Sequence, residues 1–296
     1  AFTTRPTHAT VALLETVRQN GKQQAAEAAF TLGVAAIESK DLAAAQALIL
    51  EALQLQPSNP GYLQAAAGLA FLRGEFTVAQ AYQVKSLELT RAALGAGDLR
   101  VALLMDGLGT IYLARHGYSQ AERIWRESLA IREQVLGKMH PSIPPRLNDL
   151  AGLTLHDGRF EETELLLKRA LHILEADSEA ERMDVAIGLH NLAEFYVDRQ
   201  RSVEAETLYR KAQAIWKTVP EQQRLQIAAS LNELGNAYLA QRRQAGARSQ
   251  FELVIGLLED DLGPDHRYVR EAMETLDKMN SGQEKPGERR EIDQRM

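Results

Sequence analysis

One short motif recurs along this chain at a fixed spacing, and that spacing restricts the fold more than any other feature. The motif reads Leu-Gly/Ala-x-x-Tyr, and its clearest copies begin at Leu108, Leu192 and Leu234. An Ala follows nine residues after each Tyr, and an aromatic residue follows four residues after that Ala. Gly109 and Gly235 lie 126 residues apart, which is three periods of 42. A repeat of this length predicts the stacked supersecondary units of a solenoid.

Weaker copies at Leu150-Ala151, at Ala67 and at Leu32-Gly33 extend the pattern, the last after a shorter step of 34 residues. The pattern predicts six helical hairpins. In each, helix A carries the Gly or Ala of the motif, and helix B carries the later Ala and the aromatic or aliphatic residue. The expected helix pairs are 25–39 and 42–55, 60–73 and 76–94, 99–115 and 118–136, 142–157 and 160–176, 183–199 and 202–217, and 224–241 and 244–261.

The small residues of helix A are expected to let it approach its own helix B. A Gly inside a helix is about 1 kcal/mol less favourable than Ala, so the recurrence of Gly33, Gly109 and Gly235 at one position indicates a packing reason. Trp125 is expected to fill the core, whereas Trp216, near the end of its helix, is either a core residue or an exposed binding residue. Gly or polar residues mark the turns within hairpins, where Gly is expected to adopt the left-handed conformation that ends a helix.

Both ends of the chain are predicted to cap this array. Residues 1–24 hold an amphipathic helix at 7–19, residues 25–262 hold the six hairpins, and residues 263–280 hold a second capping helix at 266–279. The terminal units of a solenoid need a polar outer face. Residues 281–296 have almost no apolar side chains and are predicted to be a disordered polar tail.

The composition excludes several classes of function. The net charge is -6 with acidic and basic residues interspersed, which argues against nucleic acid as a partner because phosphate binding needs concentrated Lys and Arg. No apolar stretch approaches the roughly 18 residues needed to cross a bilayer, so no membrane insertion is expected. The chain has no Cys, so it has no disulfide, thiol nucleophile or Cys-based zinc site.

The compartment is only weakly constrained. The chain begins Ala1-Phe2 without Met, which fits either the mature end left by removal of a signal peptide or a trimmed chain. We expect an exported bacterial protein, with the cytoplasm as the alternative to the periplasm.

The repeat resembles a known family. Leu136-Gly137-Lys138-Met139-His140-Pro141 and Leu147-Asn148-Asp149-Leu150-Ala151 are similar to the linker and the helix A signature of the tetratricopeptide repeat, in the 42-residue variety found in kinesin light chain and many bacterial proteins. The resemblance implies an all-α, right-handed solenoid of antiparallel hairpins whose A helices line a concave groove for a peptide or a partner protein. His140-Pro141 is then a linker determinant. The first two repeats depart most, with Gln83 where an aromatic residue is usual.

The same resemblance predicts which residues face the groove: those three before, and one, four and five after, the Gly or Ala of helix A. The candidates for peptide binding are Phe30, Gln64, Phe71, Asp106, Thr110, Asn148, His156, His190, Glu194, Asp198, Asn232 and Asn236. Asn offers a donor and an acceptor to an extended peptide, and the acidic residues favour Lys or Arg on the ligand. We therefore expect a protein or peptide partner, basic in the part that the acidic residues contact.

Other kinds of site are less favoured. His190, Glu194 and Asp198 share one helix face and could bind a metal with His156, but a polar groove lining is preferred and no metal is predicted. Gly107-Leu108-Gly109 lacks the preceding strand of a dinucleotide site, so no cofactor is expected. No strained nucleophile turn is evident. The sequence thus predicts a non-enzymatic interaction scaffold, with a self-associating module that packs through its convex face or its ends as the alternative.

Overall fold

The computed structural model describes residues 8–177 and 182–281, with side chains from residue 19 onward except those of residues 182 and 202. Within these residues the secondary structure is entirely helical, with no strand. The chain divides into two compact units, Ala1–Asp157 and Gly158–Met296. This confirms the prediction of an all-α helical-repeat solenoid.

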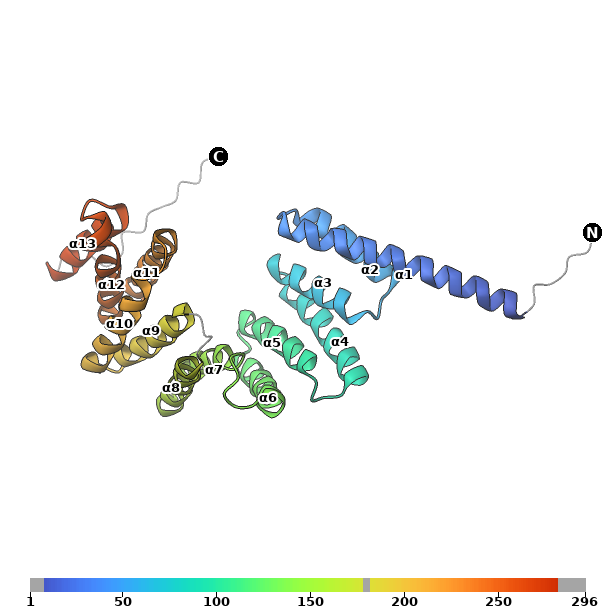
Figure 1. The fold of residues 1–296 in the computed structure, drawn as a ribbon, viewed down its shortest axis with the longest axis horizontal. Coiled ribbons are helices and arrows are strands. Elements are labelled where there is room, and N and C mark those ends of the chain that lie inside the picture. The colour runs from blue at the N-terminus through green and yellow to red at the C-terminus, as the bar shows by residue number, and fades with distance from the viewer. Residues whose placement is uncertain (1–7, 178–181, 282–296) are drawn as a thin grey trace, which may run out of the picture. The chain divides into compact units, whose positions relative to one another are not determined.

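The first unit contains seven helices within its described residues (Figure 1). They are α1 (His8–Glu38), α2 (Leu42–Leu55), α3 (Pro60–Leu72), α4 (Phe76–Leu94), α5 (Leu99–Ala114), α6 (Tyr118–Leu136) and α7 (Pro144–His156). Within this unit α1, α3 and α5 each pair with the B helix that follows, and each B helix also contacts the next A helix, as in α4 with α5. Figure 1 shows α3, α5 and α7 along one side of this unit and α4 and α6 along the other.

The second unit contains six helices within its described residues. They are α8 (Phe160–Ala176), α9 (Arg182–Asp198), α10 (Ser202–Trp216), α11 (Glu221–Ala240), α12 (Gln244–Leu262) and α13 (Arg267–Asn280). Glu164 of α8 joins α9 by accepting hydrogen bonds from Tyr196 at 2.9 Å and from Arg201, just beyond α9, at 3.0 Å. Hydrogen bonds from Lys168, and then from Tyr196 and Arg201, lower the pKa of Glu164 to about 2.

The N-terminal helix differs from the expectation. A capping helix at 7–19 and a separate helix at 25–39 were expected, but α1 is one helix of 31 residues. The segment between them contains no Pro to stop a helix. Gly21 weakens the helix by only about 1 kcal/mol, less than a break would cost in lost hydrogen bonds. At the other end, α13 packs against α12 and α11 where the second cap was expected. The predicted tail lies, from residue 282 onward, outside the described residues.

The packing reason for the recurring glycines is confirmed. Each of the three faces the large residue sixteen positions later, so Gly33 faces Ile49, Gly109 faces Trp125 and Gly235 faces Phe251. A Cβ atom placed on these glycines would lie 2.9 Å from Ile49, 2.1 Å from the Trp125 indole and 2.8 Å from the Phe251 ring. All three contacts are far inside van der Waals distance. Gly is therefore required wherever helix A meets the ring or branched chain of its own helix B this closely.

The turns within hairpins share one backbone conformation, which recurs every 42 residues from Gly74 onward and after a shorter step of 34 residues from Lys40 to Gly74. The residue with positive φ is Lys40, Gly74, His116, Gly158, Gln200 or Arg242. In the turn after α3, Gly74 N–H bonds to Phe71 C=O and Glu75 N–H bonds to Ala70 C=O, which is the Schellman pattern. In the turn after α5 the left-handed residue is His116, with φ 59°, and Gly117 after it has φ -85°. The expectation that Gly takes this conformation is therefore wrong for Gly117.

Candidate interaction surface

The candidate residues fall into two groups by exposure, according to their position in helix A. Residues one or five after the Gly or Ala face solvent in most repeats; they include Gly68, Leu72, Thr110, Gly152, His156, Asp198 and Asn236. Residues three before it are covered in the later repeats, where His190 is 8 % and Asn232 is 6 % exposed. The exposed set is therefore the part of the predicted groove that a partner can touch directly.

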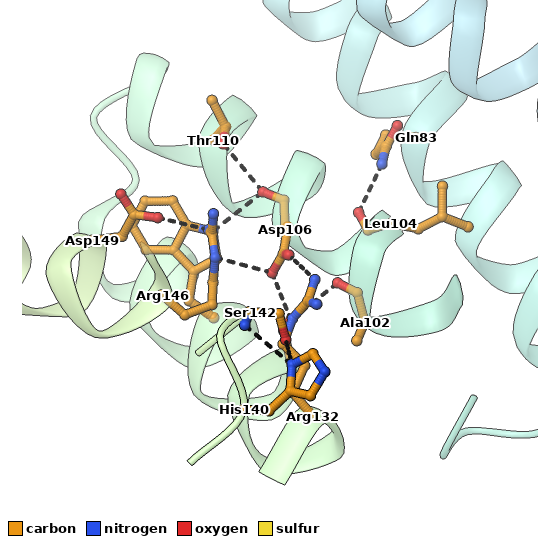
Figure 2. Close-up of polar contacts among 12 residues, drawn as sticks. Gln83, Ala102, Leu104, Asp106, Thr110, Arg132, His140, Ser142, Arg146 and Asp149 are labelled. Carbon is orange, nitrogen blue, oxygen red and sulfur yellow. Dashed lines mark hydrogen bonds and ion pairs between the residues drawn. The ribbon is translucent and has the colours of Figure 1, made fainter. Parts of the chain in front are cut away.

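Asp106 is the centre of a charge cluster in the first unit (Figure 2). Its carboxylate accepts a hydrogen bond from Ser128 Oγ at 2.5 Å and one from the Arg132 guanidinium, and Arg146 Nε lies 3.4 Å away. The side chain of Asp106 is only 13 % exposed. Since α5, α6 and α7 each contribute one charged group, the cluster ties the third hairpin to the first helix of the fourth. Thr110 is exposed, and its hydroxyl donates to Asp106 C=O at 3.2 Å.

Arg146 extends this cluster in two directions. Its guanidinium lies 5.3 Å from the centre of the Trp125 ring, within the range of a cation–π contact. Arg146 Nη1 also lies 2.9 Å from Asp149 Oδ2. Burial raises the pKa of Asp149, although the nearby Arg146 opposes this effect. The Asp106 carboxylate is therefore already neutralised from within the chain.

His190 belongs to a buried network in the second unit. Its Nε2 lies 2.9 Å from Gln250 Oε1, and the Gln250 amide donates to Glu194 at 3.2 Å and to Tyr209 Oη at 3.3 Å. A carboxylate can only accept, which orients the Gln250 NH₂ group toward Glu194 and places its oxygen against His190. His190 Nε2 therefore carries the proton. The imidazole also packs against the rings of Tyr209 and Trp216, each with centroids 5.6 Å away.

Asp198 lies at the end of α9 and is paired with Arg243, which precedes α12. Arg243 donates two hydrogen bonds from Nη2 to the carboxylate. The same guanidinium lies 4.0 Å from the centre of the Tyr238 ring. Burial, reinforced by Glu194, raises the pKa of Tyr238. Like Asp106, Asp198 is thus held by an Arg of its own chain.

Two of the three Asn candidates, Asn148 and Asn232, have polar atoms that are only partly satisfied. Asn232 Nδ2 reaches Tyr268 C=O at 3.5 Å, the limit of a hydrogen bond, and so connects α11 to α13. Its Oδ1, and Oδ1 of Asn148 in α7, are buried without a hydrogen-bond partner among the described residues. Asn232 is buried and Asn148 is half-buried, whereas Asn236, one turn further along α11, is exposed.

The remaining candidates lie in the first unit. Phe30 packs against Tyr62 with ring centroids 4.8 Å apart, and Phe71 packs against Phe76 at 5.3 Å, so both serve as core residues at least in part. Gln64 is exposed. His156 is exposed, and its ring lies 4.3 Å from that of Tyr118.

The structure brings together some of the candidates and leaves others apart. His190 and Glu194 share one network on α9, and Asp198 lies one turn further along. Asn148 and His156 lie in the other unit. Among the described residues, no three His, Asp or Glu side chains are grouped as metal ligands would be. None of the helices described is long and apolar enough to span a bilayer.

Sequence reasoning missed the residues that engage the candidates from other helices, namely Arg132, Arg146, Arg243 and Gln250. Trp216 is buried, at 3 % exposed, so it is not the exposed binding residue that remained open. The linker role of His140 is supported by its Nδ1 atom, which accepts the Ser142 backbone N–H at 3.1 Å. One contact between helices A and B does recur at a fixed sequence offset, and such an offset could have revealed it. Ser86 donates to Pro60 C=O, and Ser128, one period later, donates to Ala102 C=O.

Antiparallel hairpins that repeat every 42 residues, with a small residue of one helix against a large residue of the next, define a helical-repeat protein of the solenoid class. A family model for the tetratricopeptide repeat matches residues 61–134 and 184–260, together half of the chain. The chain belongs to the tetratricopeptide repeat family.

Solved structures agree on the fold. BtubC from P. vanneervenii superposes with a TM-score of 0.58 at 18 % identity, covering 68 % of this chain and 90 % of its own. A kinesin-light-chain-like protein of Podosopora anserina with nearly identical repeats gives 0.53 at 22 % identity, covering 69 % and 98 %. PilF of Pseudomonas aeruginosa gives 0.53 at 16 % identity, covering 86 % and 99 %. At these identities the likeness concerns the fold alone. No curated protein sequence matches the chain.

Proposed function

We propose that this protein is a non-enzymatic scaffold that binds a segment of a partner protein along the exposed face of its A helices. The observation that carries the proposal is the row of solvent-facing residues at equivalent positions of successive A helices, such as Gly68, Thr110 and Gly152. These residues contribute little to the core, and small or neutral side chains there leave room for a peptide backbone. Membership of a family whose fold commonly serves protein interaction supports the same conclusion.

The charge pairing narrows the chemistry of the partner. Asp106 and Asp198 are paired with arginines of the same chain, so a basic partner would have to displace those arginines. The exposed positions are mainly neutral, and they include the apolar Leu72 and Leu113. We therefore propose that recognition uses neutral polar and apolar contacts more than net charge.

The test is quantitative affinity capture from a lysate of the source cell. The intact chain is compared with the triple variant Gly68→Arg, Thr110→Arg and Gly152→Arg, which obstructs the A-helix face. Neither glycine has an atom near enough to collide with an added Cβ, so the fold should persist, as circular dichroism can check.

The matched control places the same three charges on exposed alanines of the B helices, Ala47→Arg, Ala81→Arg and Ala130→Arg. A protein lost from the first variant and retained by the second supports the proposal. A protein captured equally by both variants contradicts it.

Self-assembly remains the second candidate, and it has a specific observation in its favour. Leu165 of α8 and Val203 of α10 are strongly exposed for apolar side chains, and exposed apolar area often marks an interface. Sedimentation over a range of concentrations tests this alternative. A concentration-dependent dimer that Leu165→Lys with Val203→Lys abolishes would support it, and a monomer throughout would exclude it.

A further inference from the structure

The last two hairpins are joined differently from the others. In the first unit each B helix packs against the next A helix, as α2 does against α3 and α4 against α5. Between the fifth and sixth hairpins, α12 instead contacts both α9 and α10. Helix α10 is not closely packed against α11. The gap that this leaves beside α11 is called the seam below.

A cavity of about 540 Å³ occupies this seam. The cavity is lined mostly by apolar residues of α9, of the end of α10 and of α11, among them Met183, Ile187, Trp216, Ile227 and Leu234. The lining residues include no Asp, Glu, Lys or Arg. The volume falls within the roughly 300–1,000 Å³ of typical ligand sites, and the lining favours an uncharged, largely apolar occupant.

Two polar side-chain atoms of the buried lining residues, His190 and Trp216, have no partner among the described residues. The indole N–H of Trp216 is buried without an acceptor, although buried polar groups are nearly always hydrogen-bonded. His190 donates from Nε2 to Gln250, and a His ring that donates from one nitrogen can accept at the other, which here is Nδ1. The two rings lie side by side with centroids 5.6 Å apart. The cavity thus combines apolar walls with one unpaired donor and one unpaired acceptor.

We propose that this cavity binds a phenol group, with its hydroxyl accepting from Trp216 Nε1 and donating to His190 Nδ1. A hydroxyl is both donor and acceptor in one atom, and an aromatic ring suits the apolar walls. The phenol is the side chain of a tyrosine in the partner segment, so this inference rests on the proposed function, or it is a free phenolic compound with the same chemistry.

Other chemistries fit the lining less well. A plain hydrocarbon would leave both polar atoms unpaired, and a carboxylate or phosphate would lose its hydration without meeting a cation. Gln223, Gln226 and Ser230 line the cavity and are solvent-exposed. They supply amide and hydroxyl groups where the backbone of a bound segment would lie.

The experiment measures binding of p-cresol and toluene to the full chain by calorimetry, because the two probes differ only in the hydroxyl. We expect p-cresol to bind at least about tenfold more tightly. The variant Trp216→Phe keeps an aromatic ring but removes the donor, so it should bring the ratio of the two affinities close to one while leaving toluene binding unchanged. Equal binding of the two probes to the parent chain, or no binding of either at millimolar concentration, would overturn the proposal.

Two further probes distinguish the sources of the phenol. N-acetyltyrosinamide binding at least as tightly as p-cresol indicates a tyrosine side chain, whereas binding of p-cresol alone indicates a free phenolic compound. Neither measurement needs a partner protein. Retained p-cresol binding together with failed capture on the A-helix face would therefore reject the proposed function and leave the phenol site standing.

Discussion

Replacing Gly109 with Ala adds one methyl group where α5 touches α6. The added Cβ would lie 2.1 Å from Nε1, 2.5 Å from Cδ1 and 2.6 Å from Cε2 of Trp125, whereas ordinary contact begins at 3.4 Å. The indole or the helix must therefore move by more than 1 Å.

The indole has little room for such a movement. Trp125 is 2 % exposed, its N–H donates to Asp106 C=O at 3.2 Å, and the Arg146 guanidinium lies over its ring. Overpacking a core of this kind costs roughly 1–3 kcal/mol, and the crowding places Gly109→Ala in the upper part of that range. The higher helix propensity of Ala returns about 1 kcal/mol. We expect a net destabilisation of about 1–2 kcal/mol.

Gly152→Ala is the matched control. Gly152 also lies inside a helix of the first unit, but it is exposed and nothing lies within 4 Å of an added Cβ. Only the helix propensity changes there, so this variant should be stabilised by about 0.5–1 kcal/mol. The same substitution is thus predicted to have opposite signs at two helical glycines 43 positions apart.

The assay is urea unfolding followed by circular dichroism, with hydrogen exchange and mass spectrometry to localise the effect. Exchange is needed because a repeat array does not always unfold in two states. Loss of protection should centre on α5 and α6. In a Trp125→Leu background the cost of Gly109→Ala should shrink sharply. Stabilisation by Gly109→Ala in the parent chain would refute the steric reasoning.

Three further predictions concern single side chains. Asp106→Ala leaves two arginines without their carboxylate and should destabilise the chain by about 3 kcal/mol in urea unfolding, whereas Asp149→Ala, whose side chain is 39 % exposed, should cost less than about 1 kcal/mol. Gln200→Gly relieves a left-handed residue with φ 59° and should raise stability by about 1 kcal/mol in the same assay; an unchanged urea midpoint would count against it. The pKa of Glu164 is lowered to about 2 from 4.5, so its contribution is complete above about pH 4.5 and is lost as the pH falls toward 2. Thermal melts between pH 7 and pH 2 should therefore show a shallower acid loss for Glu164→Gln, and identical slopes would contradict this.

Much of the fold could be predicted because local rules and the repeat agree. The predicted bounds of α4 and α6 match the structure, and α11 begins only three residues before the expected start. The close approach of α5 to α6 at Gly109 followed from the cost of Gly in a helix together with its recurrence, but its contact with Trp125 was not predicted. The merging of the cap into α1 was not foreseen because amphipathicity marks a buried face but does not mark where a helix ends.

The candidate surface was less predictable for a physical reason. The position of a residue relative to the Gly or Ala of helix A predicts the direction in which its Cα–Cβ bond points. It does not predict which long side chain of another helix contacts that residue. Arg132 lies 26 residues after Asp106, and Arg243 lies 45 residues after Asp198. These offsets differ, so no single period reveals both pairs. Thr110, one after its Gly, is exposed and His190, three before its Ala, is buried, but the prediction assigned both positions to the groove.

The contacts of α12 with both α9 and α10 also decide where this chain can be shortened. In a regular array the linker between two hairpins is a natural truncation boundary, because each repeat touches only its neighbours. A cut at Pro220 would here remove Gln250 from between His190 and Tyr209 and strip α12 from two helices at once. The fifth and sixth hairpins therefore form one minimal folding module, about twice the length of the sequence repeat.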